Sequence, residues 1–285
     1  MLPPEYDFQR AILERIIYIA RGNILCMKTP VLFVSHGAPT LPLEPGETGA
    51  AWRELGARLE RPTAILVISA HWATRVPTLS TVQNPPTVHD FSGFPAELYN
   101  LRYPAPGAPD MARVAALALE HAGIPVQLDE TRGLDHGAWV PLSFLFPDAD
   151  LPVTQLSLQS ERNPAWHVAL GKALRPLREQ GVLIIASGSI THNLRALFAQ
   201  PQGAPVPPWV SEFCAWMADT IAAGDLEALV EYRARAPHAV QNHPTDEHLL
   251  PLFVALGAAD KIETAIHLNH VMTYGILAMD AWLFD

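Results

Sequence analysis

Four short runs of aliphatic, mostly β-branched residues constrain the fold of this 285-residue chain more than any other feature. Proline, glycine or polar residues bound each run, which is typical of strands buried on both faces of a central sheet. The runs are residues 31–35, 64–69, 153–158 and 182–187. Helical patterns alternate with them over residues 50–59, 111–122, 165–180 and 208–223. This alternation predicts a single α/β domain, with a central, mostly parallel or mixed sheet flanked by helices.

No change of composition marks a domain boundary, so we expect one domain over residues 28–285. Residues 1–27 are interpreted as an N-terminal extension or the product of an upstream start codon. Glu14 and Arg15 interrupt the apolar stretch 11–20, so it does not resemble a signal peptide. No apolar run approaches the ~18 residues that a membrane span needs. We therefore expect a cytoplasmic protein with no membrane partner.

The charge balance excludes some classes of partner. The chain has 29 acidic and 19 basic residues, a formal net charge of −10. Nucleic-acid binders carry a basic face, and proteins that dock on anionic lipid carry basic clusters. Cys26 and Cys214 are too few and too far apart for a disulfide framework or a cysteine zinc site. We expect no nucleic-acid partner, and the sequence leaves the oligomeric state open, with a monomer plausible.

Three of the predicted strands lead into a histidine. His36 and His71 follow the first two strands, and His192 follows the fourth. The carboxyl ends of strands in an open α/β sheet form the crevice where ligands bind. Imidazole is the commonest protein ligand for zinc or iron. The pattern indicates a shared metal site, although hydrogen-bonded core histidines would give the same pattern.

Two further histidines are candidates for this site. Asp135 and His136 lie between glycines. Three interpretations of the pair stay open: it supports the metal ligands, it contacts the substrate, or it forms a turn capped by Asp135. His248 precedes an apolar helix predicted over 249–258, where Thr245 is a candidate N-cap that would place His248 in the first turn. A solvent-exposed helix start is the alternative for His248. The aromatic, proline-rich loop 84–109 is either a roof over the site or a structural cover.

Other catalytic motifs are missing from the sequence. It contains no G-x-S-x-G elbow, no phosphate-binding G-x-x-x-x-G-K-[ST], no G-x-G-x-x-G after a strand and no H-E-x-x-H. This leaves little sign of a serine hydrolase, an NTPase, a nicotinamide enzyme or a zincin.

Seven motifs in order carry a family resemblance. They are SHGAP at 35–39, SAHW at 69–72, VHDFSGFP at 88–95, YPAPG at 103–107, GLDHG at 133–137, ASGSITHNL at 186–194 and HPTDEH at 243–248. Over about residues 28–282 the chain closely resembles the class III extradiol ring-cleavage dioxygenases of the LigB type, in their 4,5-DOPA dioxygenase branch. The resemblance implies a non-haem enzyme that opens a catechol ring with O2, with the catechol and O2 as its small-molecule partners.

The resemblance also implies roles for individual residues. His36, His71 and His248 correspond to metal ligands. His192 corresponds to a histidine beside the metal, an acid/base that is sometimes counted as a fourth ligand. His136 corresponds to a residue of the substrate pocket. Apart from the resemblance, a DOPA carboxylate would need a cation or backbone donors, and Arg102 and Arg195 are candidates for the cation.

Activity of this kind is expected to need Fe(II), but three histidines also suit Zn(II), so the native metal stays open. Glu247 is expected not to compete with His248, because neighbours in a helix point in different directions. The alternatives are a zinc-dependent hydrolase with Asp135 as its base, or a non-catalytic binding module on the same scaffold.

Overall fold

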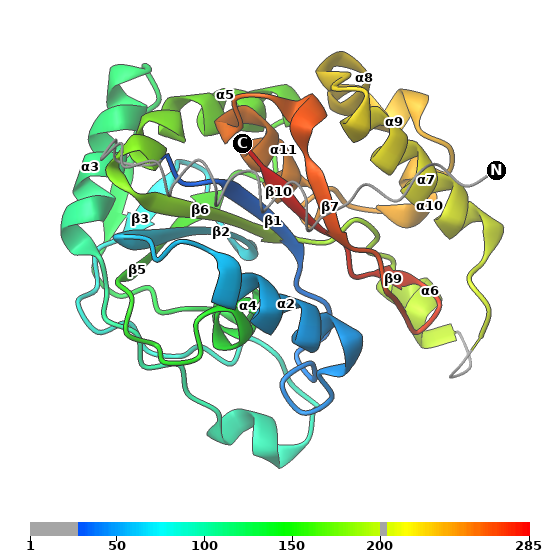
Figure 1. Ribbon diagram of the computed structural model, residues 1–285, viewed down its shortest axis with the longest axis horizontal. Helices are drawn as coiled ribbons and strands as arrows, with labels where there is room; N and C mark the ends of the chain where they lie inside the picture. The colour runs from blue at the N-terminus through cyan, green and yellow to red at the C-terminus, as the bar shows by residue number, and fades with distance from the viewer. Residues whose placement is uncertain (1–27, 200–203) are drawn as a thin grey trace.

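The computed structural model describes residues 28–199 and 204–285, in which an eight-stranded sheet lies between two layers of helices (Figure 1). The strand order is β4-β3-β5-β2-β6-β1-β10-β7. Their bounds are β1 Val31–Ser35, β2 Ala64–Ala73, β3 Thr78–Ser80, β4 Gln127–Asp129, β5 Val153–Leu158, β6 Val182–Gly188, β7 Ile266–Asn269 and β10 Ala281–Phe284. A separate hairpin pairs β8 (Met272–Thr273) with β9 (Leu277–Ala278). The predicted extension 1–27 lies outside the described residues.

The sheet is mixed, with a parallel centre. Strands β1, β6, β2 and β5 pair in parallel, whereas β10 runs antiparallel to β1 and to β7. The central strands are buried on both faces, which explains their continuous apolar sequences. This confirms the predicted α/β domain with its mixed sheet.

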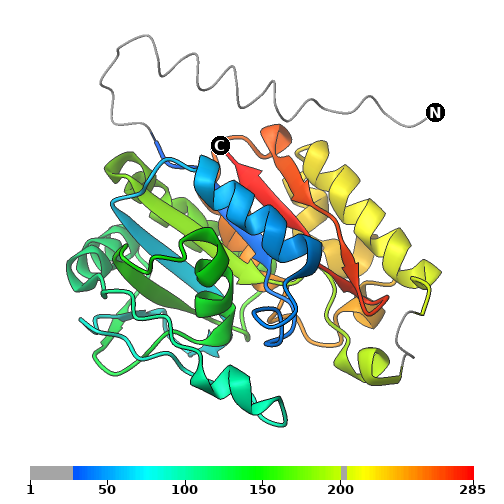
Figure 2. The ribbon, with the colours of Figure 1, turned by 60° about the horizontal axis from the view of Figure 1, so that its bottom comes forward.

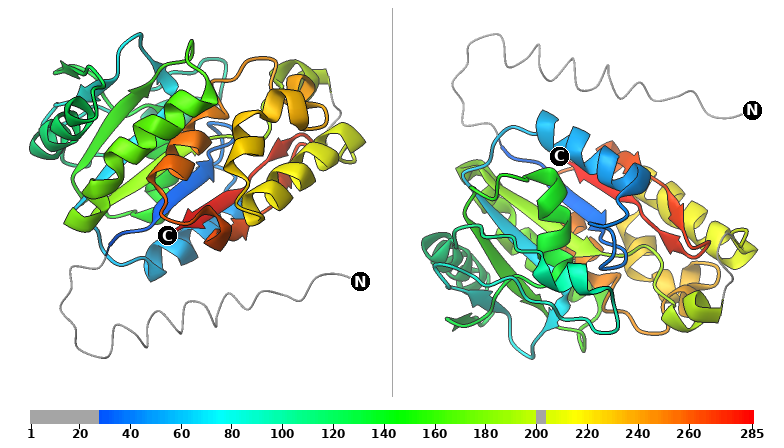
Figure 3. Two further views of the ribbon diagram at one scale, coloured as in Figure 1. Left: turned by 90° about the horizontal axis from the view of Figure 1, so that it is seen from above. Right: turned by 90° about the horizontal axis from the view of Figure 1, so that it is seen from below.

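Two groups of helices cover the sheet. Figure 3 shows α5 and α11 in front of the sheet from one side, and α2 and α4 from the other. Their bounds are α2 Gly46–Arg58, α3 Pro109–His121, α4 His136–Leu145, α5 Pro164–Leu174 and α11 Leu250–Ala258. Each face has its own apolar core, so the sheet holds both helical layers in place. Figure 2 shows the remaining helices beside the β10–β7 edge: α6 Leu194–Ala199, α7 Pro208–Ala222, α8 Leu226–Val230, α9 Tyr232–Arg235 and α10 Ala239–Asn242.

The predicted elements agree with the observed ones in position but differ at several ends. The strands at 31–35 and 153–158 have the predicted bounds, but β2 continues to Ala73, so His71 lies inside this strand. The helix predicted over 165–180 is α5 followed by the 3-10 helix η2, Arg175–Gln180. Pro176 explains this break, because proline has no N–H for a helical hydrogen bond.

Within residues 28–199 and 204–285, no helix is both long enough and apolar enough to cross a membrane.

Candidate metal centre and aromatic cavity

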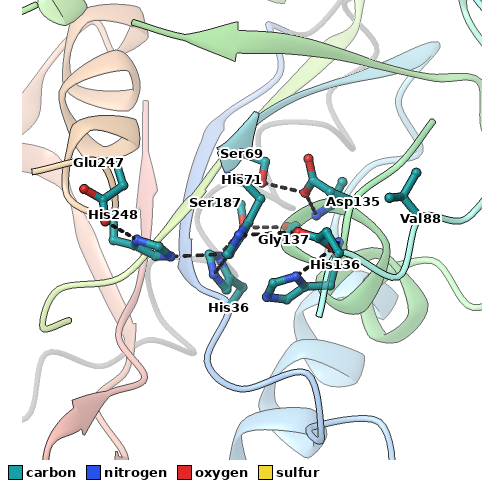
Figure 4. Close-up of polar contacts among 12 residues, drawn as sticks. His36, Ser69, His71, Val88, Asp135, His136, Gly137, Ser187, Glu247 and His248 are labelled. Atoms are coloured by element: carbon teal, nitrogen blue, oxygen red, sulfur yellow. Dashed lines mark hydrogen bonds and ion pairs between the residues drawn. The ribbon is translucent and has the colours of Figure 1, made fainter. Parts of the chain in front are cut away.

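Five histidines meet at one end of the sheet, around a cavity of about 710 Å³. His36 follows β1, His71 lies in β2, and His192 lies four residues beyond β6. His136 is the first residue of α4, and His248 lies in the turn before α11. Figure 4 shows four of these imidazoles turned toward a common point. The structure therefore brings together every histidine that the sequence suggested.

His248 reaches the site in a different way from the predicted one. The N-cap of α11 is Leu249, and Thr245 bonds to the Glu247 carboxylate, so Thr245 is not the cap and His248 precedes the helix. Pro251 occupies the second position of α11, where proline is tolerated because that N–H has no helical partner. The prediction of His248 in the first helical turn was wrong.

A close backbone contact holds the His248 turn against the end of β6. The amide of Ser189 donates to the carbonyl oxygen of His248 at 2.7 Å. A Cβ at Gly188 would lie 2.1 Å from that same oxygen. Only glycine fits this close approach, so Gly188 allows the end of β6 and the His248 turn to lie together at one site.

The ring nitrogens of His36, His71 and His248 form the strongest candidate for a metal site. Their Nε2 atoms are 3.0 Å apart for His36 and His71, and 3.3 Å apart for His71 and His248. All three ligand atoms lie within 4.8 Å of one another. Unprotonated nitrogens so close together repel through their lone pairs, and a cation between them would remove that repulsion. The donor set fits zinc or iron.

The second nitrogen of each of these rings faces an oxygen. His36 Nδ1 lies 3.0 Å from Ser187 Oγ, which itself donates to the carbonyl of Gly137. His248 Nδ1 lies 3.1 Å from Glu247 Oε1, and His71 Nδ1 lies 3.4 Å from Asp90 Oδ2. Oxygen acceptors at Nδ1 place the proton there and leave Nε2 free to bind a metal.

Burial keeps these imidazoles neutral. Desolvation, followed by the neighbouring histidines, lowers the pKa of His36 and of His248 well below 6.5. Desolvation and His136 lower the pKa of His71 to about 4, although Asp135 and Asp90 partly oppose the shift. Neutral imidazole is the form that binds metal.

His192 lies beside this group and not within it. Its ring stacks on His248 with centroids 3.4 Å apart and planes 10° apart. Desolvation lowers the pKa of His192 to about 4, against the opposing charge of Glu247. Its ligand atom groups with those of Glu247 and His248, separately from His36 and His71.

Glu247 lies closer to the site than the sequence suggested. The argument that it points away from His248 assumed a helix, but residues 243–249 form no helix. Its Oε1 contacts His248 Nδ1 and lies 4.0 Å from His192 Nδ1. Glu247 therefore supports the His248 ring on the side away from the Nε2 cluster.

Asp90 belongs to the site, although the sequence analysis did not single it out. Its Oδ1 accepts from the backbone N–H of His136 at 3.0 Å and from His136 Nδ1 at 2.9 Å. Burial would raise the pKa of Asp90, but these hydrogen bonds and the charge of His136 lower it to about 2. The sequence signal that could have identified Asp90 was its position next to His89 in the motif at 88–95. Asp90 fixes His136 against the cavity.

Asp135 is a fully buried carboxylate that joins three elements. Its Oδ1 accepts from Ser69 Oγ at 2.6 Å and caps α4 through the amide of Ala138. Its Oδ2 accepts from Gln155 Nε2 at 2.9 Å and from Arg132 Nη2 at 2.7 Å. Both oxygens are therefore satisfied, and Asp135 does not line the cavity, so it is not placed to serve as the base of a zinc hydrolase.

The aromatic loop 84–109 is both roof and structural cover. Phe91, Ser92 and Phe94 line the cavity, and the rings of Phe91 and His136 lie 5.7 Å apart. Tyr103 is buried and donates to the carbonyl of Phe146. Phe91, Ser92 and Phe94 therefore belong to the roof of the cavity, and Tyr103 belongs to the structural cover.

The two arginines suggested for a substrate carboxylate do not line the cavity. Arg102 donates to the carbonyls of Tyr99 and Leu101. Arg195 is exposed on α6. The structure does not bring either side chain to the histidine cluster.

Replacing Asp135 should disturb both the fold and the metal site. We expect Asp135→Asn to lower the free energy of unfolding by about 2–4 kcal/mol, because it leaves Arg132 without its buried charged partner. Metal affinity should fall about 10–100-fold, since Ser69 Oγ, which accepts from the amide of His71, loses its carboxylate acceptor. Urea unfolding and metal titration measure the two effects. Asp110→Asn is the matched control, because Asp110 is fully exposed; equal effects in both variants would contradict this account.

The metal-free protein should lose stability as the pH falls from about 6.5 to 4. His71 and His192 have a pKa of about 4 in the folded protein, so in this range the unfolded chain binds more protons. Each such histidine contributes up to about 1.4 kcal/mol per pH unit. Urea midpoints measured across this range test the slope. His167→Gln is a control away from the site, where burial also lowers the pKa to about 4, and it should reduce the slope. A flat profile would contradict the expectation.

Comparisons with known proteins agree with this geometry. The family model described as the catalytic LigB subunit of aromatic ring-opening dioxygenase matches residues 30–283. A 4,5-DOPA dioxygenase extradiol from Beta vulgaris is 40% identical over 257 residues, which cover 88% of this chain and 95% of that protein. A protein of the same name from Escherichia coli (strain K12) is 43% identical over 237 residues, covering 82% of this chain and 86% of that protein.

A solved structure has the same fold. The crystal structure of an uncharacterized protein from Escherichia coli K12 superposes with a TM-score of 0.77 at 34% identity, covering 90% of this chain and all of that one. The family match spans nearly all of the described residues and includes each histidine of the cavity. The chain therefore belongs to the LigB family and is a metal-dependent, extradiol ring-cleaving dioxygenase that acts on a small aromatic molecule with O2.

Proposed function

We propose that the substrate is a DOPA-like catechol and that the metal is Fe(II), held by His36, His71 and His248. The observation that carries the proposal is the trio of Nε2 atoms at 3.0 and 3.3 Å at one end of an aromatic-walled cavity. The relatives named 4,5-DOPA dioxygenase extradiol supply the substrate class. When bound, the iron would lower the pKa of the catechol hydroxyls and bring the diol and O2 together.

In this proposal His192 acts as the acid/base residue. Its pKa of about 4 keeps it neutral at pH 7, so its ring can accept a proton from a catechol hydroxyl and return it later. The stacked ring of His248 and the nearby Glu247 carboxylate fix its orientation. Because His192 lies outside the group of three Nε2 atoms, we assign it to proton transfer rather than to metal binding.

His136 positions the substrate. Its Nδ1 is bonded to Asp90 Oδ1, which leaves Nε2 free to form a hydrogen bond with a substrate hydroxyl. Phe91 and Phe94 supply an apolar surface for the aromatic ring and exclude water from it.

The two alternatives have weaker support. A zinc hydrolase would need a free general base, and the Asp135 carboxylate is fully used in the protein interior. A non-catalytic binding module has no need of His192 and His136 beside a complete trio of metal ligands. Zinc binding at the same histidines remains compatible with the geometry and would give an inactive form.

The proposal also covers the organisation of the protein. In this proposal residues 28–285 are the catalytic domain, and the oligomeric state stays open, as the sequence left it. The cytoplasmic location and the lack of nucleic-acid and membrane partners stay predictions from the sequence.

Oxygen consumption tests the proposed reaction. Full-length protein loaded anaerobically with Fe(II) should consume equimolar O2 and catechol and form a yellow semialdehyde, because extradiol cleavage opens the ring and incorporates both atoms of O2 into the product. The same protein loaded with Zn(II) is the control and should consume none. Absence of O2 uptake with any catechol, in protein shown to hold stoichiometric iron, would reject the function.

His192→Ala should separate proton transfer from metal binding. We expect kcat to fall about 10²–10⁴-fold while the iron content stays that of the wild type. Stopped-flow turnover and metal analysis provide the two readouts, with His121→Ala on the exposed end of α3 as the control. Full turnover in the iron-loaded variant would remove the acid/base role, and loss of iron would make His192 a ligand instead.

A further inference from the structure

The end of the cavity away from the histidines has no lysine or arginine among the residues that the structure describes. Its non-histidine wall comes from the loop after β1, the aromatic loop, α6 and the β8–β9 hairpin. Glu44 is the one carboxylate among the described residues that line the cavity.

Glu44 is available to a ligand. It lies in the turn before α2 and is exposed, and its carboxylate makes no hydrogen bond or ion pair with any residue in 28–199 or 204–285. Its backbone N–H is held by the carbonyl of Thr40, so the turn that carries it is ordered.

The carboxylates behind the histidine rings have the same sign of charge as Glu44. The Asp90 carboxylate bonds to the His136 ring, and the Glu247 carboxylate contacts the His248 ring. The whole chain carries a formal net charge of −10, which repels anions at longer range.

The remaining wall is apolar or aromatic. Leu194, Leu197 and Phe198 come from α6, and Tyr274 and Leu277 face them from the β8–β9 hairpin. Such a wall gains from covering alkyl groups, and aromatic faces attract an ammonium group. Among its side chains, only a few hydroxyl groups could replace the hydration of a carboxylate.

We propose, resting on the ring-cleavage function above, that this cavity selects catechols by the charge of the side chain. It accepts apolar and ammonium-bearing side chains, with Glu44 pairing the ammonium, and it discriminates against side chains whose only charge is a carboxylate. The diol end is recognised at the histidines, and the side-chain end by Glu44 and the apolar wall. A zwitterionic amino-acid side chain falls between the two extremes.

Four catechols with one ring and different side-chain charges test the proposal at pH 7. They are dopamine (cation), 4-ethylcatechol (neutral), L-DOPA (zwitterion) and 3-(3,4-dihydroxyphenyl)propanoate (anion). Equilibrium binding to iron-loaded full-length protein is measured without O2, and kcat/KM is measured with it. We expect the cation to bind and react at least about tenfold better than the anion, with the zwitterion between them.

Glu44→Gln should reduce that preference. We expect the ratio of kcat/KM for the cation to kcat/KM for the anion to fall about three- to tenfold, mainly through changes in Kd and KM. The kcat/KM for 4-ethylcatechol should change less than about twofold. Glu47→Gln is the matched control, because Glu47 is also exposed and carries the same charge three residues away but does not line this cavity. The Glu47 variant should keep the wild-type ratio.

The outcomes separate this inference from the proposed function. Anion binding equal to or tighter than cation binding, or an unchanged ratio in Glu44→Gln, would overturn the charge selection even if all four catechols are cleaved. Equal losses in the Glu44 and Glu47 variants would also overturn it, by making the effect one of net charge. If 4-ethylcatechol binds and no catechol is cleaved, the ring-cleavage function fails, and the anaerobic binding order still decides the charge selection.

Discussion

The rest of the site depends on three neutral imidazole nitrogens being held against one another inside the protein. The Nε2 atoms of His36 and His71 lie 3.0 Å apart, and those of His71 and His248 lie 3.3 Å apart. Protonation would relieve the repulsion, but burial disfavours the charged form and lowers each pKa. The fold must therefore impose this arrangement, and it does so through the groups behind each ring.

Those groups connect the site to the centre of the sheet. Ser187 at the end of β6 holds His36 and also donates to Gly137 in α4. Asp135 caps that same helix and binds Ser69 in β2, so one buried carboxylate fixes the strand that carries His71 and the helix that carries His136. A displacement of α4 would move several site residues together, and the hydrogen bonds and ion pair of Asp135 offset the cost of burying its charge.

Local sequence patterns predicted the parts of the molecule that depend on local signals. The strands at 31–35 and 153–158 are long enough and apolar enough to be recognised, and histidines at strand ends pointed to a common site. Strands β3, β4, β7 and β10 have only three or four residues each, and pairing with distant strands defines them, so no periodicity reveals them. The contact between Asp90 and His136 spans 46 residues, and one sequence cannot show it. The candidate N-cap Thr245 led to a wrong prediction for His248. The helix starts later, because of Pro251 and the hydrogen bond between Ser189 and the His248 carbonyl.

The two ends of the cavity differ in the charge that they present to the substrate. At the histidine end the ligand set is neutral, so the charge of a divalent metal has to be met by the substrate's own diol as it loses protons. At the other end Glu44 and an apolar wall face the side chain. An anionic group on the substrate is therefore favoured beside the metal and disfavoured at the opposite end. This polarity orients a catechol with its diol toward the histidines, because the reversed orientation would leave the metal's charge unmet and place acidic hydroxyls beside a carboxylate.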